Sequence, residues 1–222
     1  MRWPRTQLAV VPALLLLAAV SLCGCAAAGA ALAGGVRLSN KEVATYKAEY
    51  EIGKKPIVVI PFRDEGHTYY ESRDGVDLAT AVTGELIQRG AASNVKLDPQ
   101  VESAFEGQDP SRVVWADIGK KAGAELVLFG ILERFTLKDP KTIGIVRGTA
   151  IVDFFIYDVK KDAIVYSKRG LEVYHPETGA GIAESDISSE KLRRILLAKT
   201  AMKIVQKFYT YKEKIRPPPA RY

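Results

Sequence analysis

The chain has little cysteine and little histidine, and both shortages restrict its chemistry. Only two cysteines occur among its 222 residues, Cys23 and Cys25, and both stand near the start. The remainder therefore has no disulfide, no thiol nucleophile and no cysteine-ligated metal. The two histidines, His67 and His175, lie in loop-like sequence, where a solvated or hydrogen-bonded histidine is far commoner than a catalytic one.

Catalytic patterns are also missing. No nucleophile with a base, no metal-binding cluster and no phosphate cradle is recognisable. The segment Gly179-Ala180-Gly181 lacks the lysine and the strand-to-helix context of a phosphate loop. Four carboxylates lie close together in the sequence and resemble a metal-binding cluster: Asp64, Glu65, Glu71 and Asp74. Because Arg63 and Arg73 are interspersed with them, the segment instead indicates a mixed-charge loop. We expect no enzyme activity, no metal and no cofactor, and an unfamiliar envelope enzyme is only a remote alternative.

The first residues indicate export. Arg2 and Arg5 precede a nearly uncharged apolar run from Leu8 to Leu22, as in a signal peptide. A retained membrane-spanning helix is the weaker interpretation, because the run gives way to alanine and glycine without a polar flank.

The tetrapeptide Leu22-Cys23-Gly24-Cys25 resembles the lipobox of bacterial lipoproteins, although Cys23 departs from the usual small or β-branched residue. This resemblance implies cleavage before Cys25 and attachment of lipid, a diacylglyceryl and an acyl group, to that cysteine. Ordinary secretory cleavage after the alanine-rich stretch is the alternative. Ala26 carries no inner-membrane retention signal of the enterobacterial aspartate kind, so we expect the periplasmic face of the outer membrane, provided that the source organism sorts by that rule.

Charge gives little information about a partner. Removal of Arg2 and Arg5 lowers the formal net charge from +6 to +4, which is mildly basic. Export separates the chain from nucleic acid, and no recognition motif accompanies the charge. Nucleic-acid binding is therefore not expected.

The predicted organisation has four parts. Residues 1–24 form the signal peptide, and residues 25–55 hold the lipidated cysteine, an Ala/Gly-rich tether and a short helix that begins at the capping box Ser39-Asn40-Lys41-Glu42 and reaches about Tyr50. Residues 56–212 form one folded domain. Residues 213–222 form a proline-rich tail.

Hydrophobic periodicity predicts the elements of this domain. Strands are expected over Ile57–Phe62, Val95–Leu97, Glu125–Phe135, Ile143–Tyr157 and Ala163–Tyr174. Helices are expected over Val76–Arg89, from Asp109-Pro110 to about Lys121, and over Ser189–Lys212, with a further turn of helix at Asp98-Pro99 and a long loop at Arg63–Gly75. The order predicts an α/β (α+β) fold, a mixed sheet of mostly five strands flanked by about three main helices.

Several of these segments resemble a known family of envelope domains. The strand IVVIPF at Ile57–Phe62, the stretch Leu78–Pro99, the stretch Ile118–Phe135 with Glu125 at the acidic position, and the hairpin Thr149–Gly170 are similar to the domain shared by CsgG, the amino-terminal part of TolB, and LpoB. The resemblance covers roughly Pro56–Lys212. It implies no shared enzymatic activity, because members bind proteins, oligomerise or form export pores.

The sequence therefore predicts a lipid-anchored periplasmic binding or adaptor protein of the bacterial envelope, with an unidentified protein partner and with homo-oligomerisation possible in principle. The alternative is a subunit of an oligomeric export assembly like the curli exporter. The predicted contact residues are His67, Tyr69 and Tyr70, in the loop after the first central strand. The opposing interpretation is that both tyrosine rings fold back onto the domain.

Overall fold

The computed structural model describes residues 43–64, 73–97, 114–138, 143–177, 179 and 181–214. Apart from Val43 and Lys214, these residues belong to one unit, Ala44–Glu213. The strands are β1 Val43–Tyr46, β2 Ile57–Val59, β3 Arg63–Asp64, β4 Val95–Leu97, β5 Leu126–Thr136, β6 Ile145–Val146, β7 Gly148–Asp158, β8 Ala163–His175, β9 Ile182–Ala183 and β10 Tyr211–Lys214. The helices are α3 Asp74–Gln88, α5 Trp115–Ala122 and α6 Ser189–Val205, with a 3-10 turn at Glu184–Asp186.

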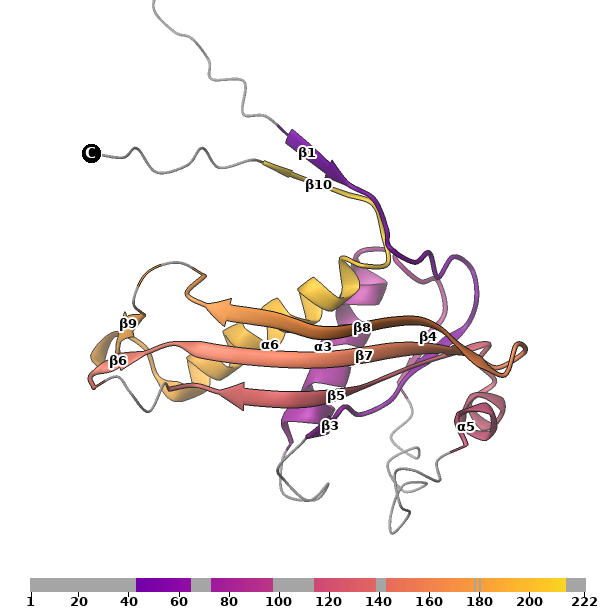
Figure 1. Cartoon of the computed structure of the whole chain (residues 1–222), viewed down its shortest axis with the longest axis horizontal. Coiled ribbons are helices and arrows are strands. Elements are labelled where there is room, and N and C mark those ends of the chain that lie inside the picture. Colours follow the sequence, from indigo (N-terminus) through magenta and orange to yellow (C-terminus); the bar gives the residue numbers. More distant parts are fainter. Residues whose placement is uncertain are drawn as a thin grey trace, which may run out of the picture. The chain divides into compact units, whose positions relative to one another are not determined.

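One mixed sheet organises these elements (Figure 1). Its strand order is β4-β2-β5-β7-β8, and β3 also pairs with β5. The strands β4, β2, β3 and β5 are parallel, whereas β5, β7 and β8 form a long antiparallel meander. The two short strands β6 and β9 pair separately, and so do β1 and β10. The predicted α/β fold with a mixed sheet and three main helices is confirmed.

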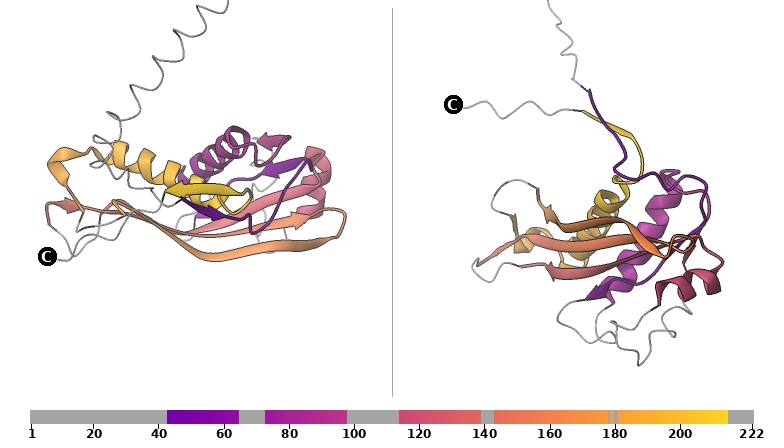
Figure 2. Two further views of the ribbon diagram at one scale, coloured as in Figure 1. Left: turned by 90° about the horizontal axis from the view of Figure 1, so that it is seen from above. Right: turned by 45° about the vertical axis from the view of Figure 1, so that its right-hand side comes forward.

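Successive residues of β2 point into two different cores, because side chains alternate across a strand. Ile57 and Val59 belong to the larger core, which α3 and α6 complete, and Val58 belongs to a smaller core completed by α5. All three residues have no exposed surface. Figure 2 shows α3 and α6 together on one side of the sheet. The two helices are also joined by Arg193, which donates to Asp74 Oδ1 (2.7 Å) and Asp77 Oδ2 (2.6 Å).

Local sequence signals explain where α6 begins and where α5 ends. Ser188 caps α6, since its hydroxyl accepts the Lys191 N–H at 3.3 Å. Gly123 ends α5 in the left-handed conformation, with φ +60, which glycine adopts without a steric penalty. Both ends agree with the sequence prediction.

The structure corrects four predicted boundaries. The short helix expected up to Tyr50 is wrong, because Val43–Tyr46 form strand β1. The loop expected over Arg63–Gly75 begins as strand β3 and ends inside α3, which starts at Asp74. Helix α6 stops at Val205 instead of Lys212. His175 is the last residue of β8 and half-buried, not part of a loop. The predicted helical turn at Asp98-Pro99 lies outside the described residues.

Candidate partner-binding face

The predicted site residues lie outside the part of the chain that the structure describes. This holds for the lipidation site Cys25 and for His67, Tyr69 and Tyr70. Both sites therefore remain predictions.

Neither a metal centre nor a membrane-spanning helix is found in the described part of the chain. No three histidine, cysteine or acidic side chains there come close enough to hold a metal ion. None of the helices in the described ranges combines the length and the apolar character needed to cross a bilayer.

The two faces of the sheet are covered unequally by the described elements. Helices α3 and α6 lie together on one face, where they complete the larger core (Figure 2). On the other face α5 covers only one end, over Val58, Val127 and Tyr157. The first residue of α5 and the strands beyond this helix carry aromatic, isoleucine and arginine side chains on this second face, which we call the arginine–aromatic face: Trp115, Phe129, Ile131, Arg134, Arg147, Ile151, Phe155, Arg169 and Tyr174.

A row of stacked rings runs across this face. The rings of Trp115 and Phe129 stack with centroids 4.0 Å apart and an angle of 17° between their planes. The register of β5 and β7 pairs Phe129 with Phe155, and these rings lie 5.2 Å apart at 24°. All three side chains are half-buried. The row joins α5, β5 and β7 through an apolar strip of half-buried rings.

A bulge in β8 places Arg169 at the end of this row. The regular pairing of β7 with β8 shifts between Val152 and Phe154, and Gly170 at this point has φ +61. The backbone N–H of Gly170 donates to Asp153 Oδ1 at 2.7 Å, which satisfies a carboxylate only 8% exposed. The neighbouring Arg169 guanidinium then lies 5.9 Å from the Phe155 ring centroid.

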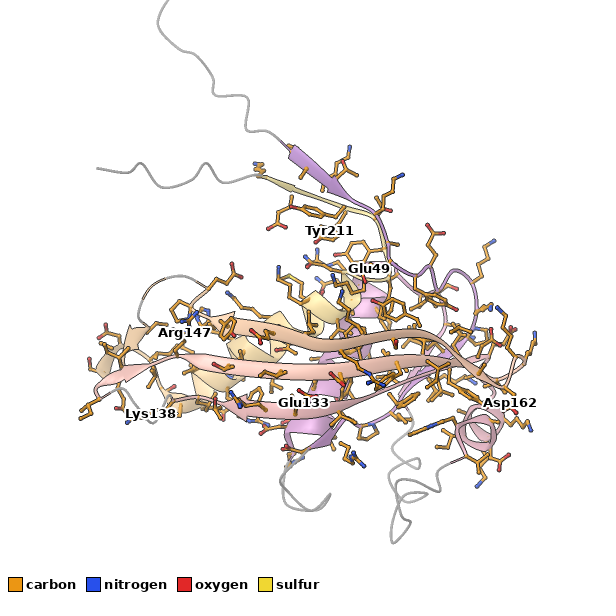
Figure 3. All side chains as sticks on the ribbon, viewed as in Figure 1. Glu49, Glu133, Lys138, Arg147, Asp162 and Tyr211 are labelled. Atoms are coloured by element: carbon orange, nitrogen blue, oxygen red, sulfur yellow. The ribbon has the colours of Figure 1, made fainter. Side chains whose placement is uncertain are left out.

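A second guanidinium lies over a ring at the far end of the face. Arg147, labelled in Figure 3, is 4.7 Å from the centroid of Tyr174. The Tyr174 hydroxyl donates a hydrogen bond to Glu172, and this bond raises the pKa of the hydroxyl. The Arg147 Nε atom is buried and donates to no described group. The Arg147 guanidinium is therefore held against the Tyr174 ring, while its Nε–H makes no hydrogen bond with a described residue.

The arginines of the two faces differ in their ion pairs. On the helical side, Arg193 and Arg194 of α6 and Arg89, the C-cap of α3, each lie within 4 Å of a carboxylate, whereas Arg73, the N-cap of α3, has no ion pair with a described residue. On the arginine–aromatic face, Arg134, Arg147 and Arg169 form no ion pair with a described residue. Arg63 of β3 lies on this side of the sheet too, because it pairs with Ile131. It also forms no ion pair with a described residue. Arginine donors beside aromatic rings can bind a partner but supply no nucleophile or base.

Comparisons with known proteins give structural likenesses only. No protein-family model and no curated protein sequence matches the chain. A PelC dodecamer from Paraburkholderia phytofirmans matches with 15% identity and a TM-score of 0.45, over 76% of this chain and 98% of that one. A lipoprotein from Neisseria meningitidis matches with 16% identity and a TM-score of 0.46, over 68% and 99%. TolB from Acinetobacter baumannii matches with 13% identity and a TM-score of 0.33, over 75% of this chain and 31% of TolB.

Proposed function

We propose that this chain is a lipid-anchored binding module of the bacterial cell envelope, which holds a partner protein on its arginine–aromatic face. The observation that carries the proposal is the unequal covering of the sheet among the described residues. Two helices bury one face, whereas the other presents stacked rings and arginines without carboxylate partners. Arginine and aromatic side chains are enriched in protein interfaces and among the residues that dominate binding energy.

The anchoring half of the proposal depends on the amino terminus. The lipobox-like Leu22-Cys23-Gly24-Cys25 follows an apolar run of signal-peptide type. The resemblance to the CsgG, TolB and LpoB domain supports a role through protein contacts, and Ala26 after the cysteine favours the periplasmic face of the outer membrane where sorting follows the enterobacterial rule. It also leaves oligomeric assembly as the alternative role.

Lipidation is tested by metabolic labelling with a fatty acid. The wild-type chain should carry the label and partition with membranes, because Cys25, the residue that follows the predicted cleavage site, is expected to carry the lipid. Cys25→Ser should remain unlabelled, whereas Cys23→Ser should be labelled normally since the signal peptide is removed. Equal labelling of Cys25→Ser and wild type would contradict the anchoring model.

Partner binding is tested by placing a photo-crosslinking amino acid at Ser167 in the full chain. Ser167 is exposed and pairs with Phe155, so it lies on the arginine–aromatic face. The matched control places the crosslinker at Arg194, which is 72% exposed on α6, on the covered side of the sheet. Irradiated cells should yield an adduct of defined mass from position 167 and none from 194. An adduct whose mass is a multiple of the chain favours the oligomeric assembly, and no adduct at 167 removes the proposal.

A further inference from the structure

From the charges of this face we infer that the partner presents an acidic segment that also carries aromatic or apolar side chains. The inference rests on the proposed function and specifies the chemistry of the partner. Four arginines lie on this side of the sheet without an ion pair to a described residue: Arg63, Arg134, Arg147 and Arg169.

The carboxylates of the same face do not balance these arginines. Asp153 is buried and accepts the Gly170 N–H. Glu172 accepts the Tyr174 hydroxyl. Only Glu133 is exposed without a hydrogen bond or ion pair to a described residue, and Figure 3 labels it on β5. Glu172 keeps its charge in its hydrogen bond with Tyr174, so the outward-facing charge of this face consists of four guanidinium groups against the exposed Glu133 and Glu172 carboxylates, and it is net positive.

Two of the guanidinium groups are held in place by rings. Arg147 lies over Tyr174 and Arg169 beside Phe155, so their planar donors are partly fixed before a partner arrives. A planar fork of N–H donors matches the two oxygens of a carboxylate, and such charge-assisted bonds are roughly twice as strong as neutral ones. Arg193 shows in this chain that one guanidinium can bind several carboxylate oxygens, because it donates to one oxygen of Asp74 and one of Asp77, at 2.7 and 2.6 Å.

The rings define the rest of the recognised segment. Trp115, Phe129 and Phe155 stack nearly parallel to one another, which forms a row of half-buried rings that ends beside Arg169. Aromatic or apolar side chains of a partner bury surface on such a strip while adjacent carboxylates reach the guanidinium groups. Rings that stack upon each other are not extended outward for insertion into a bilayer, which disfavours a lipid surface.

A second copy of the same face fits poorly. A two-fold dimer places one patch against itself, so it would bring eight guanidinium groups together with only the Glu133 and Glu172 carboxylates of each copy. The excess of like charge at such an interface is unfavourable. The charge pattern therefore favours a partner of opposite sign over self-association through this face.

The test measures binding of a short fluorescent peptide of alternating glutamate and tyrosine by anisotropy, using the processed full chain. The face variant combines Arg147→Gln with Arg169→Gln. The control combines Arg89→Gln with Arg194→Gln, which removes the same charge from exposed positions at the C-cap of α3 and on α6. The face variant should bind about tenfold or more weakly, and the control should stay within about twofold of wild type. Thermal melts of both variants confirm that the fold is intact.

Four further measurements decide the chemistry. The variant with Arg147→Lys and Arg169→Lys keeps the charge and should still bind more weakly than wild type, because lysine lacks the planar fork. A peptide of alternating lysine and tyrosine should not bind. Equal loss in the face variant and the control, no binding of the glutamate–tyrosine peptide, or stronger binding to phosphatidylglycerol vesicles would each overturn the inference. A crosslink at Ser167 that persists unchanged in the face variant leaves the proposed function standing and rejects an acidic partner.

Discussion

Gly130 leaves the space on β5 into which the Phe62 ring packs. It lies in β5 opposite Phe154, on the side that faces α3 and α6. A Cβ atom added at Gly130 would lie 2.5 Å from the Phe62 ring and 2.4 Å from the Asp153 carbonyl oxygen. Phe62 itself is only 2% exposed, so it has little room to move. The absence of a side chain at position 130 therefore allows Phe62 to lie flat against the sheet.

At the residue scale we predict that Gly130→Ala destabilises the domain by about 1–3 kcal/mol, because overpacking forces the ring or the strand to shift. Gly84→Ala is the matched control. Gly84 is exposed within α3, and nothing lies within 4 Å of the position of its Cβ. That substitution should stabilise the helix by roughly 0.5–1 kcal/mol. Urea unfolding measures both changes, and a Gly130→Ala domain as stable as wild type would refute the packing argument.

At the element scale, the last helix and the first strand show where periodicity fails as a guide. Phe208 and Tyr209 continue the helical spacing of apolar residues, so the sequence predicts a helix up to Lys212. In the structure Phe208 does enter the core, but Tyr211–Lys214 pair with Val43–Tyr46 as β10 and β1. Tyr46 and Tyr211 stack with centroids 5.0 Å apart. This pairing joins residues that are far apart in the sequence, and no local pattern records it.

Glu49 connects this two-stranded ribbon to the domain (Figure 3). Its carboxylate accepts hydrogen bonds from Lys207 Nζ at 2.7 Å and from the Tyr166 hydroxyl at 2.8 Å, and Lys168 Nζ lies 3.5 Å away. The Lys207 hydrogen bond holds the pKa of Glu49 below its ordinary value, although partial burial acts in the opposite direction. A carboxyl group whose pKa is lowered by folding stabilises the fold at pH values above its unfolded pKa.

The prediction for this element concerns the pH dependence of stability. The contribution of Glu49 should be fully present near pH 7 and disappear as pH falls through its lowered pKa. Glu49→Gln should therefore be less stable than wild type at pH 7, by at most about 1 kcal/mol because the group is partly exposed, and the two should converge in acid. Glu51→Gln, at an exposed position nearby, should change little. Urea unfolding at several pH values checks this. A constant difference at all pH values would contradict the role given to Lys207.

At the scale of the whole molecule, the arginine–aromatic face exists because the described layers cover the sheet unequally. The sequence predicts β5, β7 and β8 and the helix at α5, so it predicts the parts of this face. It does not predict their convergence. Arg134, Arg147 and Arg169 belong to three separate segments and share one side only through the registers of β7 with β5 and β8. The bulge in β8 that positions Arg169 likewise depends on the pairing of β7 with β8 and on the hydrogen bond from Gly170 to Asp153.

The last prediction concerns cooperativity. Adjacent residues Val58 and Val59 face opposite cores, so the α5 layer and the α3–α6 layer share one strand. We expect both layers to unfold in a single transition. After signal-peptide cleavage Trp115 is the only tryptophan, so its fluorescence reports on α5, while far-ultraviolet circular dichroism is dominated by α3 and α6. The two melting curves should coincide. A fluorescence transition at lower temperature would show that α5 unfolds independently.

Two valine substitutions make this test specific. Val59→Asp places an unpaired carboxylate where no surface is exposed, at a cost of several kcal/mol, which is comparable with the whole stability of a small domain. It should abolish both transitions together, although Val59 faces only the larger core. Val114→Asp changes the same residue type at the N-cap of α5, where the side chain is 56% exposed and makes no capping hydrogen bond. An aspartate there can accept hydrogen bonds from the free N–H groups of the first turn. Both transitions should therefore stay coincident and shift to higher temperature, with a gain of about 1 kcal/mol or less in the free energy of unfolding. If Val59→Asp removed the dichroism transition and left that of Trp115, the two layers would be separate folding units.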